Sequence, residues 1–267
     1  MDLGLKNKVA LVLASSKGLG LACAKGLYEE GANVIICSRS EKNLIEAKKQ
    51  IESSQSLMRD NKVISVVADL MYEFQIKNLV ETTLGEFKRI DILVHNAGGP
   101  PSAPMSKITS EDWSNSIDLN LRSFIRICDL TVPIMQKQGS GRIIAITSVS
   151  VKQPLNNLVL SNTTRLGIVG FAKTLANEYA KDKILVNVVC PGPNLTGRMK
   201  EIISKMAQDS GKSEEEVKKS WTDQIPLGRM GNPEELANLV VFLASAKASY
   251  ITGTVMQVDG GFVKGPF

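Results

Sequence analysis

The sequence predicts a single doubly wound α/β domain, in which helices cover both faces of a seven-stranded parallel sheet. Short, continuously apolar runs alternate with longer amphipathic segments along the 267 residues. Uninterrupted apolar runs are typical of strands that are buried on both faces, as in parallel sheets. No Pro-, Gly- or Ser-rich linker and no internal repeat divides the chain, so we expect one Rossmann-type domain over residues 1–267.

Seven apolar runs are the candidate strands, in chain order. They are residues 9–13, 33–37, 63–68, 90–94, 142–147, 185–189 and 254–258. Among the amphipathic segments between them, the two longest, at about 110–136 and 156–179, have more apolar positions than one core-facing side needs. We therefore expect these two helices to face a partner subunit as well as the core, in a homo-oligomer.

Composition argues against several classes of protein. The net charge is +5, and Lys and Arg are interleaved with acidic residues, so we expect no nucleic-acid and no membrane partner. No apolar run approaches the roughly 20 residues of a membrane span, and the N-terminal segment lacks a signal-peptide pattern. We expect a cytoplasmic protein.

The cysteines and the histidine predict no metal site. Cys23, Cys37, Cys128 and Cys190 are far apart in apolar surroundings, without a C-x-x-C pair, so we expect buried, reduced thiols. His95 is the single histidine, which argues against a His-based metal site.

A glycine-containing turn follows the first strand, where a helix is expected to begin. It comprises Ser15, Ser16, Lys17, Gly18, Leu19 and Gly20. Glycines let the backbone N–H groups of a helix N-terminus approach a pyrophosphate closely, and the helix dipole favours the negative charge. The turn therefore predicts a dinucleotide site.

The end of the second strand indicates which dinucleotide is bound. Ser38 stands where an NAD-binding protein places an acid, and Arg39 follows it. Without the carboxylate, a guanidinium can pair with a 2′-phosphate, and Lys17 can reach the same group. We therefore favour NADP(H) over NAD(H); the alternative is that both residues are ordinary surface cations.

Further along the chain, residues 143–173 read IIAITSVSVKQPLNNLVLSNTTRLGIVGFAK, which resembles the catalytic segment of the short-chain dehydrogenase/reductase family. The family pattern continues in Asn96-Ala97-Gly98, in Pro191-Gly192-Pro193-Asn194-Leu195-Thr196 and in Asp259-Gly260-Gly261. The resemblance covers roughly residues 6–262. It implies a homotetramer built on the two long helices, and a mobile helical lobe over the substrate at about 195–223, which is alternatively a solvated surface helix pair.

Two positions depart from that family. Its Tyr-x-x-x-Lys motif is replaced by Ser161 and Arg165, with Ser148 at the usual interval of 13 residues before Ser161. Ala14 takes the place of the first glycine in the dinucleotide turn. Residues 160–165, LSNTTR, are similar to the L-S-N-x-x-R of a divergent branch that resembles 3-oxoacyl-acyl-carrier-protein reductases.

The resemblance implies roles for particular residues. The catalytic candidates are Ser148, Asn120, Ser161 and Arg165. The cofactor candidates beyond the glycine turn fall into four groups. Asp69 and Leu70 are expected at the adenine, and Asn96, Ala97 and Gly98 follow the fourth strand in the chain. Arg165 is expected at the ribose, and Pro191, Gly192 and Thr196 at the nicotinamide.

Two functions stay open from the sequence. The first is an oxidoreductase acting on a small carbonyl or alcohol, with a water relaying the proton that a Tyr would supply. The second is a non-catalytic NADP(H)-binding sensor or scaffold. His95 is interpreted as a structural hydrogen-bonding residue rather than a base. Lys152 is either an exposed loop lysine or a group that stabilises an oxyanion.

Overall fold

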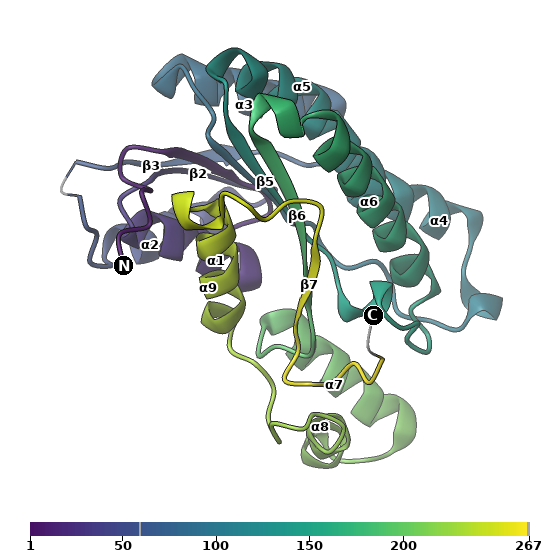
Figure 1. The fold of residues 1–267 in the computed structure, drawn as a ribbon. Coiled ribbons are helices and arrows are strands. Elements are labelled where there is room, and N and C mark those ends of the chain that lie inside the picture. The colour runs from purple at the N-terminus through teal and green to yellow at the C-terminus, as the bar shows by residue number, and fades with distance from the viewer. Residues whose placement is uncertain (59, 266–267) are drawn as a thin grey trace.

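In the computed structural model, which describes residues 1–58 and 60–265, seven parallel strands form one sheet in the order β3-β2-β1-β4-β5-β6-β7 (Figure 1). The predicted fold class is confirmed. The strands are β1 (Val9–Val12), β2 (Asn33–Ser38), β3 (Val63–Val67), β4 (Ile92–His95), β5 (Gly141–Ile146), β6 (Ile184–Pro191) and β7 (Val255–Val258).

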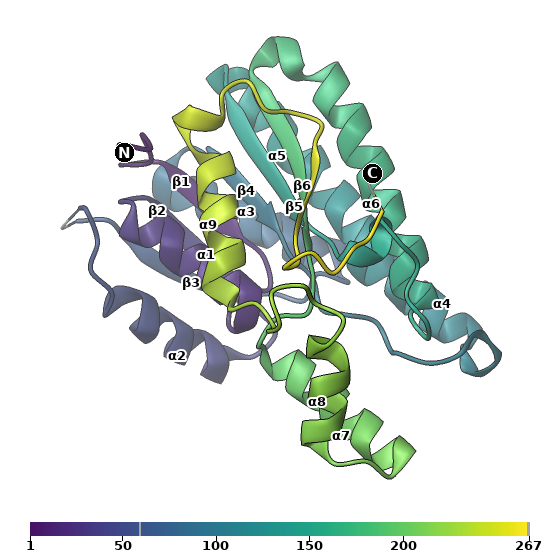
Figure 2. The ribbon, with the colours of Figure 1, turned by 60° about the horizontal axis from the view of Figure 1, so that its bottom comes forward.

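Helices cover both faces of this sheet (Figures 1 and 2). On one face lie α1 (Gly18–Glu29), α2 (Glu41–Glu52) and α9 (Pro233–Ala244). On the other lie α3 (Glu73–Phe87), α5 (Ser123–Gln138) and α6 (Val159–Glu178), with α4 (Ser110–Ser116) leading into α5. The core is accordingly divided by the sheet into two apolar clusters, as expected for strands that are buried on both sides.

The two helices of the predicted lobe project from the carboxyl edge of the sheet (Figure 2). They are α7 (Gly197–Ser210) and α8 (Glu214–Thr222), and they pack against each other. Ile203 and Val217 join the core on their inner side, while most of their charged residues are exposed. Trp221 stacks on Phe262 with ring centroids 6.2 Å apart, so the C-terminal segment holds the end of α8.

The strand predicted to begin at residue 90 begins at Ile92 instead. The side-chain amide of Gln138 accepts from the backbone N–H of Ile90 at 2.9 Å and donates to its carbonyl at 2.8 Å. Because α5 takes both backbone groups of Ile90, they are not available to a neighbouring strand.

The helix predicted over about 110–136 is interrupted by a π-helical turn, η2 (Ile117–Arg122), between α4 and α5. The helix predicted from residue 156 begins at Val159, because Asn157 has a positive φ of 59° that an α-helix does not allow. Single turns of 3₁₀-helix complete the chain: η1 (Met105–Lys107), η3 (Val149–Val151), η4 (Ala180–Asp182) and η5 (Ala246–Ala248).

The strand order reverses between β1 and β4, which pair with each other while the chain proceeds outward from both. In doubly wound sheets, ligands bind in the crevice outside the carboxyl ends of the strands at this switch point. The loops that follow β1, β4, β5 and β6 all emerge along that edge, and these loops hold most of the residues that the sequence singled out.

Candidate functional site

The conformation of the turn after β1 depends on the backbone of Ala14 and on a hydrogen bond from Asn96. Ala14 adopts a positive φ of 45°, so it takes up the conformation that glycine would favour, at the cost of some strain. The Asn96 side-chain amide, at the end of β4, donates to the Ala14 carbonyl at 3.1 Å. A Cβ on Gly20 would lie 2.6 Å from that carbonyl and 2.8 Å from Asn96 Nδ2. Gly20 is therefore required for α1 to approach the turn.

The side chain of Ser15 is not available to a ligand. Its hydroxyl is fully buried, donates to the Val12 carbonyl at 2.6 Å and accepts from the Cys37 N–H at 3.2 Å. Its backbone N–H donates to the Cys37 carbonyl at 2.9 Å. Ser15 thus ties the end of β1 to β2, and neither its hydroxyl nor its N–H is free for a cofactor contact.

The N-terminus of α1 is open to an anion. Lys17 occupies the N-cap position, is exposed and makes no side-chain cap, so the first N–H groups of the helix have no side-chain partner. Gly18 has a φ of 57°, and a Cβ there would lie 3.4 Å from the methyl group of Thr196. Gly18, the partly buried Ser16 and Leu19, and Thr196 from the loop after β6 are thus brought together, and this cradle fits a pyrophosphate.

The cofactor candidates at the other strand ends lie along the same edge. Ser38 ends β2 and accepts from the Ser40 N–H at 3.1 Å, and Arg39 after it is exposed and forms no salt bridge with a described residue. Past β3, the Asp69 carboxylate accepts from the Met71 N–H at 3.0 Å, and Leu70 is buried.

The two remaining loop segments are both adjacent to the switch point. Ala97 is buried and Gly98 is exposed in the loop that follows β4. Pro191 ends β6, and a Cβ on Gly192 would lie 2.7 Å from Asp259 Cα, so a glycine lets the loop after β6 pass close to β7.

Three serines form a connected series beyond β5, in which Ser150 contacts Ser148 through its backbone N–H and Ser161 through its hydroxyl. Ser148 Oγ accepts from the Ser150 N–H at 3.1 Å, and Ser150 Oγ lies 3.4 Å from Ser161 Oγ on α6. Because Ser148 Oγ accepts here, its own proton is free for another partner. Sequence reasoning missed Ser150; the only signal was its position two residues after Ser148 at a strand end.

Arg165 is buried at the carboxyl end of β5. Its Nη1 donates to the Thr147 carbonyl at 3.1 Å and to the Ile146 carbonyl at 3.3 Å. Burial lowers the pKa of Arg165 to about 10, so the guanidinium is still a cation at neutral pH. Arg165 lies one helical turn from Ser161, which places its charge beside the serine series.

The π-helical turn brings Asn120 to α6. Asn120 is fully buried; its Nδ2 donates to the Ser116 carbonyl at 3.2 Å, and its Oδ1 has no partner among the described residues. Ser116 Oγ lies 3.5 Å from Thr164 Oγ1, and a Cβ on Gly167 would lie 3.0 Å from the Leu121 side chain. The turn that carries Asn120 therefore packs on the turn of α6 that carries Arg165.

His95 has a structural contact, as the sequence interpretation expected. Its Nε2 lies 3.0 Å from Ser123 Oγ, and that hydroxyl donates to the Leu119 carbonyl at 2.5 Å. The imidazole therefore donates to Ser123 and ties β4 to the end of the π-helical turn. Burial, followed by the charge of Arg165, lowers the pKa of His95 to about 3.

The cysteines are buried free thiols, as predicted. Burial raises the pKa of Cys23 and Cys37 to about 12, so they stay protonated. Among the described residues, no three His, Cys, Asp or Glu side chains are grouped as a metal site would require. In the same part of the chain, no helix combines the length and apolar character needed to cross a membrane.

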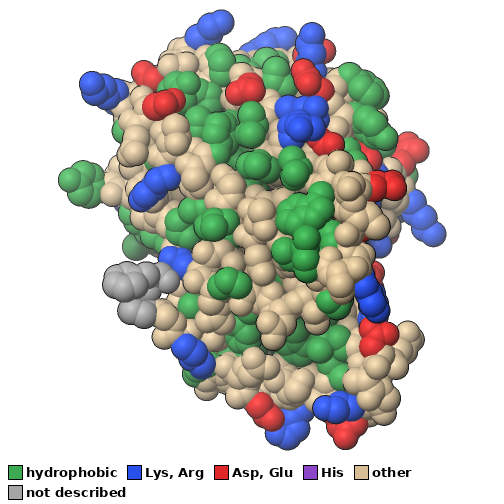
Figure 3. Space-filling model, turned by 90° about the vertical axis from the view of Figure 1, so that its right-hand side faces the viewer, with side chains coloured by type: hydrophobic (Ala, Val, Ile, Leu, Met, Phe, Trp, Pro, Cys, Tyr) green, Lys and Arg blue, Asp and Glu red, His purple; other side chains and the backbone are tan. Residues whose placement is uncertain are grey.

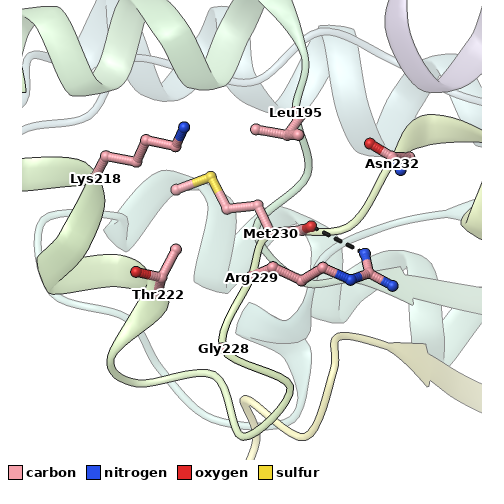
Figure 4. Close-up of a pocket in the computed structure, with 7 residues that line it drawn as sticks. All are labelled: Leu195, Lys218, Thr222, Gly228, Arg229, Met230 and Asn232. Carbon is pink, nitrogen blue, oxygen red and sulfur yellow. Dashed lines mark hydrogen bonds between the residues drawn. The ribbon is translucent and has the colours of Figure 1, made fainter. Parts of the chain in front are cut away.

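A cavity of about 340 Å³ lies at the joint between the lobe and the segment before α9 (Figure 4). Its walls are formed by Leu195, Lys218, Thr222, Gly228, Arg229, Met230 and Asn232. Arg229 is held by Glu235 through two contacts of 2.7 Å, and donates to the Met230 carbonyl at 3.2 Å. None of the catalytic candidates lines this cavity.

The fold and the cleft define a Rossmann-type α/β protein whose polar residues gather at the switch point. A family model described as enoyl-(acyl carrier protein) reductase matches residues 13–263. The chain belongs to the short-chain dehydrogenase/reductase family of oxidoreductases.

Its relatives include reductases that match over nearly their full length. The 3-oxoacyl-[acyl-carrier-protein] reductase FabG of Aquifex aeolicus is 36% identical over 98% of this chain and 99% of that protein. The human dehydrogenase/reductase SDR family member 4 is 33% identical over 96% of this chain and 88% of that protein.

Solved structures that are similar to this chain are also reductases. L-sorbose reductase from Gluconobacter frateurii, complexed with NADPH and L-sorbose, superposes with a TM-score of 0.93 at 34% identity, covering 99% of this chain and 100% of that one. Actinorhodin polyketide ketoreductase with NADPH gives 0.91 at 29% identity, covering 97% and 98%. These neighbours support a nicotinamide cofactor for this chain.

The burial of His95 predicts a dependence of stability on pH. Below the ordinary imidazole pKa of 6.5, the unfolded chain binds a proton that the folded chain does not bind until about pH 3. The free energy of unfolding should therefore fall by about 2 kcal/mol between pH 7 and pH 5. Urea denaturation of the native protein and of His95→Gln at pH 7, 6 and 5 measures this; equal pH slopes in the two proteins would contradict it.

Proposed function

We propose that this protein is an NADP(H)-dependent oxidoreductase, similar to 3-oxoacyl-acyl-carrier-protein reductases, that reduces a small carbonyl or oxidises an alcohol at an atypical active site. The observation that carries this proposal is the grouping of Ser148, Ser161 and Arg165 at the carboxyl end of β5, beside the switch-point crevice. The cofactor, when bound, supplies or accepts the hydride. The residues of the chain orient the substrate and move the proton.

Each part of the site has a task in this proposal. Ser148, whose proton is free, donates to the substrate oxygen. Ser161 and Ser150 hold a water that relays a proton from bulk solvent, because the Ser161 side chain lacks the ring that would carry its hydroxyl to the substrate. Arg165 binds the nicotinamide ribose and stabilises negative charge on the substrate oxygen, but it stays protonated and so transfers no proton. Asn120, with an unpartnered buried oxygen, holds a further water of the relay.

The cofactor contacts complete the proposal. The cradle of Gly18, Gly20 and Thr196 takes the pyrophosphate, and Arg39 with Lys17 takes the 2′-phosphate of NADP(H). Asp69 and Leu70 border the adenine, Ala97 and Gly98 line the cleft beside it, and Pro191 and Gly192 border the nicotinamide. The α7–α8 lobe covers the substrate: Arg198 at the start of α7 donates to the Pro100 carbonyl at 3.2 Å, across the cleft entrance.

The second candidate is a non-catalytic NADP(H)-binding protein. It is favoured by one observation, the hydrogen bond between Ser150 and Ser161, because this bond engages the hydroxyl that stands in the place of the usual acid. The two candidates predict the same cofactor binding and differ only in turnover.

Cofactor preference should depend on Arg39. We expect NADPH to bind roughly tenfold more tightly than NADH, and Arg39→Asp to reverse the order, because a carboxylate repels the 2′-phosphate. Fluorescence titration of both cofactors measures this. Lys137→Asp, an exposed charge reversal on α5 across the sheet, is the matched control and should keep the native preference. Equal affinities of the native protein for the two cofactors would refute the assignment.

Restoring the family's acid should raise turnover. We expect Ser161→Tyr with Arg165→Lys to reduce generic ketones roughly 100-fold or more faster than Ser161→Phe with Arg165→Lys, which adds the ring without its hydroxyl. Ser148→Ala should lower native turnover, because the donor to the substrate oxygen is lost. The measurement is NADPH oxidation with a panel of carbonyls. Tight NADPH binding without turnover in any of these proteins would favour the binding-protein candidate.

We also propose that the protein is a homotetramer assembled through α5 and α6. Over these helices the surface carries many hydrophobic side chains, with charges mostly toward its edges (Figure 3). Leu166 is 54% exposed there, and Leu130, Ile134, Val169 and Phe171 are only partly covered. The proposed partner for this face is the same face of a second copy, and the pairing of two such dimers gives the tetramer.

Light scattering should return four times the chain mass of 28.9 kDa at micromolar concentration. Leu166→Asp should reduce this mass, because a carboxylate would be buried without a partner. Leu57→Asp, at a residue that is 60% exposed but outside that face, should leave the mass unchanged. A native protein that scatters as a monomer would rule out the assembly.

A further inference from the structure

The positive charge of Arg165, at the carboxyl end of β5, has no counter-charge among the residues that the structure describes. Arg165 is bonded only to two backbone carbonyls, and no Asp or Glu oxygen of the described residues lies within 4.0 Å of its guanidinium. By contrast, Arg198 at the cleft entrance is paired with Glu201 at 3.5 Å. A buried cation without an anion is costly, so this charge is expected to be matched by something that the site binds.

The rest of the guanidinium is available for such a contact. Its Nε and Nη2 have no hydrogen-bond partner among the described residues, and neither atom is completely enclosed, since Arg165 remains 7% exposed. A guanidinium has five N–H donors in a planar fork. A contact with the nicotinamide ribose uses one or two of them, and a neutral ribose leaves the charge unmatched.

Lys152 supplies a second unpaired cation at the same place. It directly follows η3, is half-buried rather than fully exposed, and its ammonium has no hydrogen bond or salt bridge with a described residue. Thr147 Oγ1 lies 3.3 Å from Cys190 Sγ, which joins the strand end that Arg165 contacts to the end of β6. Burial raises the pKa of the Cys190 thiol, and the charges of Lys152 and Arg165 both oppose this shift, so both cations lie within electrostatic reach of that thiol.

Two acids on elements that border the crevice, Asp118 and Asp259, are already engaged. Asp118 on the π-helical turn pairs with Arg122. The two Asp259 oxygens beside Gly192 accept from the N–H groups of Gly261 at 3.0 Å and Val263 at 2.9 Å. The cofactor's 2′-phosphate is assigned to Arg39 at the end of β2, three strands away from β5 in the sheet.

We infer that the substrate is a small oxo acid, with a carboxylate adjacent to its reacting carbonyl or one carbon away, and that Arg165 and Lys152 bind this carboxylate. The inference rests on the proposed function and specifies its substrate class. An Arg fork matches the two oxygens of a carboxylate, and Lys152 adds a point charge. In the reducing direction the carbonyl carbon gains a hydride, the oxygen gains a proton from water held by the serine series, NADPH is oxidised, and the product is a hydroxy acid.

Binding tests the inference apart from turnover. Isothermal calorimetry of the protein saturated with NADP⁺, which cannot reduce a ketone, compares acetoacetate with methyl acetoacetate, which has the same ketone and no charge. We expect acetoacetate to bind roughly tenfold more tightly. Lys152→Met should remove most of this preference and Lys152→Arg should retain it, while Lys137→Met on α5 is the control for loss of an exposed charge. Equal affinities for acid and ester, or a preference unaffected by Lys152→Met, would overturn the inference.

Turnover with NADPH separates this inference from the proposed function. A higher kcat/KM for acetoacetate, which Lys152→Met lowers through KM, supports both. Reduction of acid and ester with equal kcat/KM leaves the oxidoreductase in place and overturns the anion site. Preferential binding of acetoacetate with no reduction of either compound retains the anion site and contradicts the oxidoreductase.

Discussion

The site depends on the parallel direction of all seven strands. Parallel pairing places every carboxyl end at one edge, and the reversal between β1 and β4 opens a crevice there. Beyond the residues through which these two strands pair, a side-chain hydrogen bond from Asn96 to the carbonyl of Ala14 joins the turns that follow them. That bond holds Ala14 in an unfavourable left-handed conformation, and the absence of a side chain at Gly20 lets α1 close onto the turn. The anion-accepting end of α1 is aimed by these contacts.

Charge is the second organising feature. We propose that Arg165 and Ser161 stand at the family's Lys and Tyr positions, and burial strengthens the electrostatic effect of this Arg on its neighbours. Water and salt would screen the charge of an exposed guanidinium. Burial lowers the pKa of Arg165 to about 10, so it is still a cation at neutral pH, and its charge acts on its neighbours with little screening. The same charge helps to keep the neighbouring His95 neutral. A neutral His95 can be buried against Ser123, where it steadies the π-helical turn that presents Asn120.

Most of the fold could be predicted because its signals are local. A run such as residues 33–37 is apolar at every position, and this pattern is typical of a strand covered on both faces wherever it lies in the sheet. Errors arose where a distant side chain intervened. Gln138 removes Ile90 from the strand through contacts across 48 residues, and the π-helical turn forms where Asn120 packs on α6. Neither event leaves a trace in the periodicity of its own segment.

By itself, the sequence determined the fold class, the glycine turn after the first strand and the chemical type of each candidate group. It did so because apolar runs, glycines and strand-end motifs influence the conformation of residues that are close to them in the sequence. Only the tertiary structure decided which of these groups are free to act. The Ser15 hydroxyl is engaged in a hydrogen bond to the Val12 carbonyl, and Ser150 joins Ser148 to Ser161. Among the described residues, neither Arg165 nor Lys152 forms a salt bridge with an acid. Burial and pairing depend on residues that are remote in the chain, so they follow from packing rather than from any local pattern.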